Sequence, residues 1–90
     1  MKEKDFSKLL YSAVMTLKSD EECKRLFEDL CTPKEIKSIA QRFAVAKMLS
    51  EGRIYNEIVE KTGASTATIS RVNRTMSEGS KTVLERLKNV

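Results

Sequence analysis

The sequence predicts an all-α protein of about six helices, organised as one domain over residues 1–90. Apolar residues recur at three- and four-residue intervals along most of the chain, which is the period of an amphipathic helix. Recognisable helix starts precede several of these segments. No alternation of apolar and polar residues is long enough to indicate a strand. With 40% hydrophobic residues, 90 residues can bury a small core.

Two helices are expected before residue 32. The first covers residues 3–18 and has an apolar stripe of Phe6, Leu9, Leu10, Ala13, Val14 and Leu17. Ser19 opens the second, with Glu22 three residues later as the second half of a capping box. Its stripe consists of Cys23, Leu26, Phe27 and Leu30.

A long central helix begins at Thr32-Pro33-Lys34-Glu35, where Thr32 caps, Pro33 takes the first helical position and Glu35 completes a capping box. It is expected to end at Ser50 or Glu51, just before Gly52. One face consists of Ile36, Ile39, Ala40, Phe43, Ala44, Met48 and Leu49, and Val45 and Ala46 widen it. Because this helix is apolar on nearly all sides from Phe43 onward, we expect an intertwined homodimer.

Residues 54–76 predict a helix-turn-helix unit, with Gly63 ending its first helix and Ser65 or Thr66 capping its second. Ile58, Val59, Ala64, Ile69 and Val72 are spaced to share one core. No acidic residue lies between Ala64 and Ser77. A second helix of this kind enters the DNA major groove. The residues expected to contact DNA are Ser65, Thr66, Ala67, Thr68, Ser70, Arg71 and Arg74.

The chain is expected to close with a turn at residues 77–80, in which Ser80 caps a last helix over residues 81–89. Val83, Leu84 and Leu87 form the apolar set of that helix.

Composition argues against several other classes of protein. The chain has no His, and its two Cys are eight residues apart, so neither a metal site nor a disulfide framework is predicted. The sequence shows neither a nucleophile paired with a base nor paired carboxylates of the kind that would indicate an enzyme. The longest apolar run, Phe43–Ala46, is far too short to cross a membrane, and a cytoplasmic location is expected by default.

The motifs Thr32-Pro33-x-Glu35, Gly52 and Gly63-Ala64-x-x-Ala67-Thr68-Ile69-x-Arg71 resemble the tryptophan repressor family, in particular the tryptophan-repressor-like proteins of the YerC/YecD type. The resemblance covers roughly residues 26–89. It implies a six-helix, interlocked homodimer that binds double-stranded DNA and regulates transcription, most simply as a repressor.

The resemblance also implies a position for a ligand, a tryptophan-like corepressor. Arg42 and Arg71 match the two arginines that sandwich the indole, and Thr75 matches a pocket serine. Val72 replaces a glycine and is expected to fill the space that the indole needs, so a tryptophan-like corepressor is possible but disfavoured. Arg42 is then either the partner of an acid such as Asp29 or a solvated side chain.

The function predicted from these observations is sequence-specific DNA binding by a transcriptional regulator that reads the major groove with residues 65–76. The alternative is a helical protein-interaction or metabolite-sensor module that has lost DNA binding. A positive, open surface around Arg71 and Arg74 favours the first, whereas a neutralised or covered one favours the second.

Overall fold

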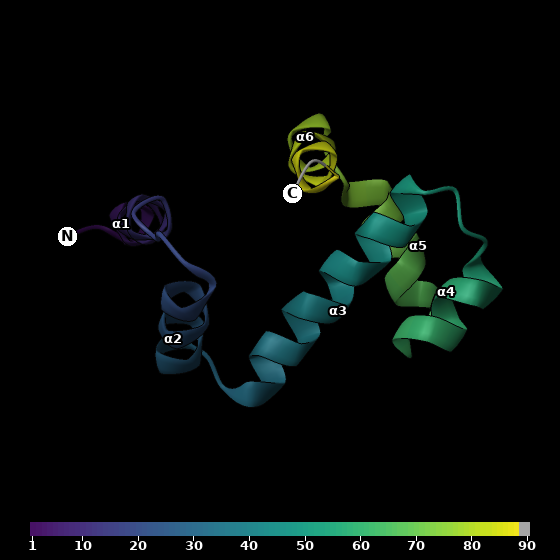
Figure 1. Cartoon of the computed structure of the whole chain (residues 1–90), viewed down its shortest axis with the longest axis horizontal. Helices are drawn as coiled ribbons and strands as arrows, with labels where there is room; N and C mark the ends of the chain where they lie inside the picture. The colour runs from purple at the N-terminus through teal and green to yellow at the C-terminus, as the bar shows by residue number, and fades with distance from the viewer. Residues whose placement is uncertain (89–90) are drawn as a thin grey trace. The chain divides into compact units, whose positions relative to one another are not determined.

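The computed structural model describes residues 1–88 and contains six helices, with no strand among these residues. The helices are α1 (Glu3–Val14), α2 (Asp20–Leu30), α3 (Pro33–Ser50), α4 (Tyr55–Thr62), α5 (Thr66–Thr75) and α6 (Glu78–Leu87), as labelled in Figure 1. The predicted all-α class is therefore confirmed. None of the described helices is long and apolar enough to span a membrane.

The chain divides into two compact units, residues 1–36 and the residues from Lys37 onward, and α3 runs from the first into the second. This division into compact units does not decide whether residues 1–90 fold as one domain, so the single domain stays a prediction.

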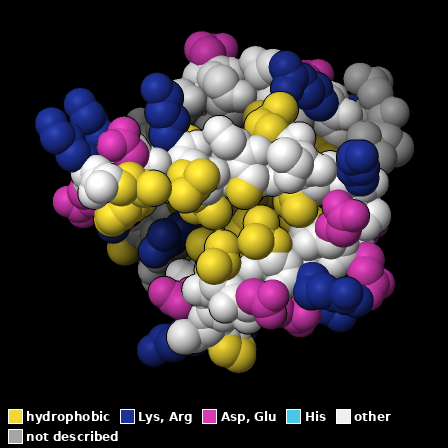
Figure 2. All heavy atoms as spheres, turned by 90° about the vertical axis from the view of Figure 1, so that its left-hand side faces the viewer, with side chains coloured by type: hydrophobic (Ala, Val, Ile, Leu, Met, Phe, Trp, Pro, Cys, Tyr) yellow, Lys and Arg dark blue, Asp and Glu magenta, His cyan; other side chains and the backbone are white. Residues whose placement is uncertain are grey.

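The first unit exposes most of its apolar surface. Neither α1 nor α2 contains a buried residue, and Phe6, Leu9 and Leu30 are each more than half exposed. An apolar hollow of about 370 Å³ is lined by Leu10, Tyr11, Val14, Leu26, Phe27, Leu30 and Cys31. Figure 2 shows hydrophobic side chains gathered at the surface of the face it presents, with charged side chains around them. The stripes predicted on these two helices are thus present but largely uncovered.

The second unit contains the buried core. Val45 of α3, Ile58 of α4 and Ile69 of α5 form one cluster with Ala64 of the turn between α4 and α5, with exposures of 0–2%. Val59 and Val72 pack against it, so the predicted shared core of the helix-turn-helix unit is confirmed. Val45 was expected at the margin of the α3 apolar face, but it is the fully buried α3 residue, whereas Ile39 and Phe43 are 50% and 42% exposed.

Local chemistry explains where α3 begins and ends. The Thr32 N–H donates to the Glu35 carboxylate at 2.8 Å, and the Glu35 N–H donates to the Thr32 hydroxyl at 3.1 Å, so the predicted capping box is present. After Ser50 the chain turns through Gly52 at φ 78°, a left-handed conformation that glycine adopts without steric cost. Both predicted boundaries of the long helix are confirmed.

Two helix ends differ from the expectation. Helix α1 stops at Val14 instead of residue 18, and the Thr16 hydroxyl donates to the Ala13 carbonyl at 2.7 Å just beyond it. Helix α6 begins at Glu78 because Ser77, not Ser80, is the cap, and its oxygen accepts from the Ser80 N–H. The expected end of that helix at residue 89 lies outside the described residues.

The capping box predicted for α2 is only half correct. Ser19 accepts from the Glu22 N–H at 3.1 Å as expected. The Glu22 carboxylate, however, accepts from the N–H of Lys18 at 2.9 Å and not from that of Ser19. The carboxylate still satisfies a free N–H beside the helix start, one residue earlier in the chain.

The Glu35 cap predicts a specific dependence of stability on pH. The Thr32 N–H, and to a lesser extent the Thr32 hydroxyl, lower the pKa of Glu35 below its ordinary value of 4.5. A depressed pKa in the folded state gives stability that is present above the unfolded pKa and lost as pH falls through the folded one. The Tm difference between the wild type and Glu35→Gln should therefore shrink between about pH 6 and about pH 3, measured by circular dichroism.

Glu28→Gln removes an exposed carboxylate from α2 and controls for the change in net charge. If the Tm difference for Glu35→Gln stays constant over the same pH range, the charged cap does not stabilise α3.

The cap of α5 predicts a difference between two neighbouring hydroxyls. Ser65 accepts from the Thr68 N–H at 3.1 Å, whereas the exposed Thr66 is the first residue inside the helix. Ser65→Ala should lower the free energy of unfolding by about 1 kcal/mol in urea denaturation, because the N-cap bond is lost. Thr66→Ala should change it by less than about 0.5 kcal/mol. Equal losses for the two variants would contradict this assignment of the cap.

Candidate nucleic-acid interface

The turn between α4 and α5 places the second helix of the helix-turn-helix unit. Helix α4 ends at Gly63 with φ 74°, and the Gly63 N–H donates to the Val59 carbonyl at 2.9 Å. Ala64 then enters the core with 2% of its surface exposed, and Ser65 caps α5. The glycine stop and the cap predicted from the sequence are confirmed, with Ser65 rather than Thr66 as the cap. In Figure 1, α4 and α5 lie together beside the C-terminal half of α3.

Helix α5 has an inner and an outer side. Ile69 is fully buried, and Val72 and Met76 continue the inner side at helical spacing, each half-buried. On the outer side, Thr66, Ser70 and Arg74 follow one another at four-residue intervals, as do Ala67 and Arg71. Ser70 is half-buried, and the other four are exposed.

The outer side of α5 is positively charged and not neutralised. Among residues 1–88, neither Arg71 nor Arg74 is in an ion pair, and no carboxylate lies between Ala64 and Ser77. Arg53, near the start of α4, contrasts with them, because its guanidinium contacts Glu57 at 3.2 Å and Glu51 at 3.7 Å. Arg71 and Arg74 therefore keep their donors free for an anion.

The predicted DNA-contacting residues form two groups. The Ser65 hydroxyl donates to the Thr68 hydroxyl at 3.0 Å and accepts from the Thr68 N–H, so these two hydroxyls are engaged in the cap. Thr66, Ala67, Arg71 and Arg74 are exposed beyond it. The positive end of the α5 dipole lies on the same side as Thr66, which favours an anion there.

Some of the residues matched to a ligand site line one cavity. Arg42 of α3 with Val72 and Thr75 of α5 line an open cavity of about 370 Å³, which also includes residues of α6 such as Val83. The Arg71 side chain is exposed and is not part of this lining. The Thr75 hydroxyl donates to the Arg71 carbonyl at 3.0 Å, so its donor is already used. The expected pairing of Arg42 with Asp29 would join the two units and stays a prediction.

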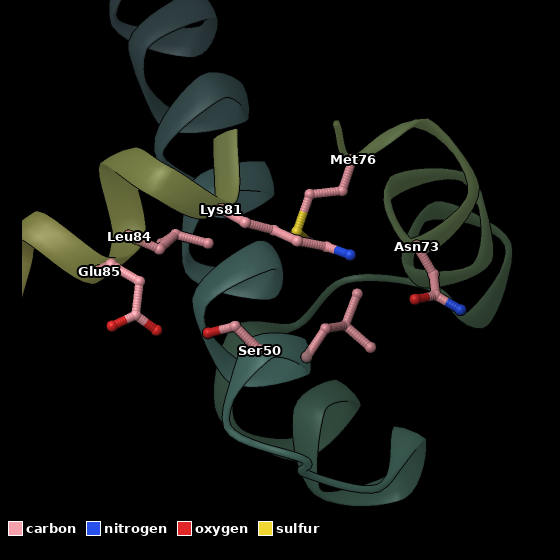
Figure 3. Close-up of a pocket in the computed structure, with 7 residues that line it drawn as sticks. Ser50, Asn73, Met76, Lys81, Leu84 and Glu85 are labelled. Carbon is pink, nitrogen blue, oxygen red and sulfur yellow. The ribbon is translucent and has the colours of Figure 1, made fainter. Parts of the chain in front are cut away.

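A second cavity, of about 390 Å³, was not anticipated from the sequence. Leu49, Ser50, Asn73, Met76, Lys81, Leu84 and Glu85 line it. Figure 3 shows the Met76, Lys81 and Leu84 side chains in the space between α3, α5 and α6. The Lys81 ammonium contacts the Glu78 carboxylate at 3.3 Å, and both side chains are more than half exposed. Among the described residues, no group of three potential metal ligands occurs.

Two polar contacts that the sequence did not reveal connect elements of the second unit. The Gln41 amide of α3 donates to the Thr62 carbonyl of α4 at 3.0 Å. The Asn73 amide of α5 lies 3.5 Å from the Tyr55 hydroxyl oxygen of α4, a long contact at an exposed position. Sequence periodicity carries no signal for either contact, since the partners are 21 and 18 residues apart.

Comparison with known proteins gives consistent matches. Residues 6–90 match the family model described as Trp repressor protein. The YerC protein of Bacillus subtilis (strain 168), which is described as uncharacterised, is 56% identical over 70 residues, covering 78% of this chain and 67% of YerC.

Two solved structures are similar in both fold and sequence. A TrpR-like protein from Eubacterium eligens ATCC 27750 is 54% identical with a TM-score of 0.85, over 90% of this chain and 87% of that one. A candidate Trp repressor from Staphylococcus aureus is 42% identical with a TM-score of 0.87, over 93% and 87%. On these matches the chain belongs to the Trp repressor family.

Proposed function

We propose that this protein is a dimeric, sequence-specific DNA-binding regulator of transcription, most simply a repressor, that reads the major groove with α5. The observation that carries the proposal is the outer side of α5, where exposed Arg71 and Arg74 have no acidic partner among residues 1–88. Membership of the Trp repressor family supports it.

The shape of the outer side suits a groove. Thr66, Ala67 and Ser70 are small, so the backbone of α5 can approach base edges closely. An arginine fork can bind a phosphate or the two acceptors of guanine. We assign Arg71 and Arg74 to phosphate or base contact and Thr66 and Ala67 to the groove floor. Ser65, Thr68 and Ser70 support the same surface at the N-terminal half of the helix.

The uncovered apolar surface of the first unit supports a second copy of the chain as the partner. The hollow between α1 and α2 has nearly no polar lining, and both helices lack a buried residue. Apolar surface of this extent contributes about 25 cal/mol for each Å² removed from water, so burial against another chain is favourable. In a dimer, two copies of α5 could enter successive major grooves on one side of the DNA.

The proposal includes DNA binding without a tryptophan-like corepressor. Val72 packs against the buried core of the second unit and lines the cavity at Arg42, which is where the ligand would have to fit. DNA affinity should therefore be the same with and without added tryptophan. A gain in affinity, or a rise in Tm with tryptophan, would show that Val72 leaves room for the ligand.

DNA binding is tested by fluorescence anisotropy with duplexes selected from a random-sequence pool. Selected duplexes should bind more tightly than bulk DNA, and affinity should fall steeply with salt as counterions are released. If no duplex binds more tightly than bulk DNA, the proposal is wrong and the protein-interaction alternative is favoured.

Arginine variants test the assigned surface. Arg74→Ala should weaken binding of a selected duplex by about 1–3 kcal/mol if it contacts a base, or reduce the salt slope by about 1 if it contacts a phosphate. Arg71→Ala should behave in one of the same two ways. Arg25→Ala is the matched control, because it removes the same charge from an exposed position on α2. Equal effects of all three variants would indicate only a dependence on net charge.

The dimer is tested by light scattering after gel filtration. The measured mass should be about twice the 10.2 kDa of one chain. Leu10→Glu, which places a carboxylate in the apolar hollow, should lower that mass toward one chain. Ser12→Glu introduces the same group at an exposed position off the apolar stripe of α1 and should leave the mass unchanged. A wild-type mass of one chain would refute the dimer.

A further inference from the structure

The C-terminal end of α4 is held by a polar contact from α3. The Gln41 side-chain amide donates to the Thr62 carbonyl at 3.0 Å, and the contact is partly buried. Thr62 is the last residue of α4, so this carbonyl is one of those that a helix leaves without an intrahelical partner. Gln41 therefore satisfies a group that would otherwise need water in a half-buried place.

Thr62 also makes side-chain hydrogen bonds that hold the turn after α4. The Thr62 hydroxyl donates to the Ile58 carbonyl at 2.7 Å and accepts from the Ala64 N–H at 3.1 Å. Ala64 is buried and lies immediately before Ser65, the cap of α5. A continuous set of hydrogen bonds thus runs from Gln41 through Thr62 to Ala64, the residue before the cap of α5.

Gln41 is on the face of α3 that meets the helix-turn-helix unit. It lies one turn before the fully buried Val45, and Met48 follows one turn later on the same side. Val45 fixes the distance between α3 and the unit by apolar packing, which has no direction. The hydrogen bond from Gln41 has a direction, and its acceptor lies at the turn beside Gly63.

We propose that Gln41 is a positioning residue for DNA recognition, which holds the α4–α5 turn against α3 and so sets the angle at which α5 leaves it. This inference rests on the proposed function for its effect on DNA. Its structural part, a turn held by Gln41, stands independently.

The expected consequence is a loss of specificity more than of stability. One hydrogen bond contributes about 0.5–1.5 kcal/mol, which is roughly a 2- to 10-fold change in an equilibrium. Gln41→Met keeps the length of the side chain and removes the donor. It should weaken binding to a selected duplex by about 10-fold, and change binding to bulk DNA by less than about 2-fold. Phosphate contacts tolerate a small rotation of α5, whereas base contacts do not.

Gln41→Glu supplies a readout that a purely structural role would not give. Its carboxylate cannot donate to the Thr62 carbonyl, but its protonated carboxyl can. Relative to the wild type at the same pH, specific affinity of this variant should recover as the pH falls toward about 4. Gln41→Met should not recover. An equal response of the two variants to pH would overturn the role of the donor.

Hydrogen exchange tests the held turn without DNA. In Gln41→Met, exchange at the Ala64 N–H should accelerate by about 10-fold, while the N–H groups at Val45 and Ile69 change little. Val45→Ala is the control, since a cavity in the core lowers protection in the whole unit. Unchanged exchange at Ala64 would refute the inference even if the protein binds DNA. Accelerated exchange in a protein that binds no specific duplex would refute the proposed function and the DNA part of the inference, and leave the held turn standing.

Discussion

The packing of Val45 against Ile58, Ala64 and Ile69 is the constraint on which the helix-turn-helix unit depends. These four side chains come from α3, α4, α5 and the turn between α4 and α5, and they are almost completely removed from water. Full burial of a Val or Ile side chain contributes about 1.5–3 kcal/mol. A core of this size stabilises the folded state only modestly, so the free N–H and C=O groups at the helix ends need hydrogen-bond partners close by. The caps at Ser65 and Ser77 and the left-handed Gly63 do this.

The small core and the large uncovered apolar surface are two consequences of the same composition. The chain has enough hydrophobic residues for a larger core, but residues such as Phe6, Leu9 and Leu30 remain more than half exposed. Buried residues occur only in α3 to α6 among the described helices. The second unit thus has its own interior, whereas α1 and α2 present exposed apolar faces, which the proposed second copy of the chain would cover.

The sequence predicted what local chemistry determines. Gly63 was identified, and the cap of α5 was narrowed to Ser65 or Thr66, because a left-handed stop and an N-cap each need particular residue types. The start of α6 was misplaced because Ser77 and Ser80 are both competent caps, and the residues between them do not distinguish the two. Val45 was misplaced because α3 is apolar on nearly all sides, so periodicity does not select a face. Gln41 was missed because its partner lies 21 residues away in the chain.

The ten residues of α5 both pack against the core and present the exposed arginines. A change on one side of this short helix therefore affects the other side. Ile69 and Val72 fix the helix to the core, and Arg71 and Arg74 project from its other side. Val72 belongs both to the packing of the core and to the wall of the cavity at Arg42. A side chain at position 72 therefore sets the space in that cavity and the seating of α5 together. Replacing it with a smaller residue would enlarge the cavity and loosen α5 in one step, which is the physical reason for proposing that a valine at this position goes with DNA binding that needs no corepressor.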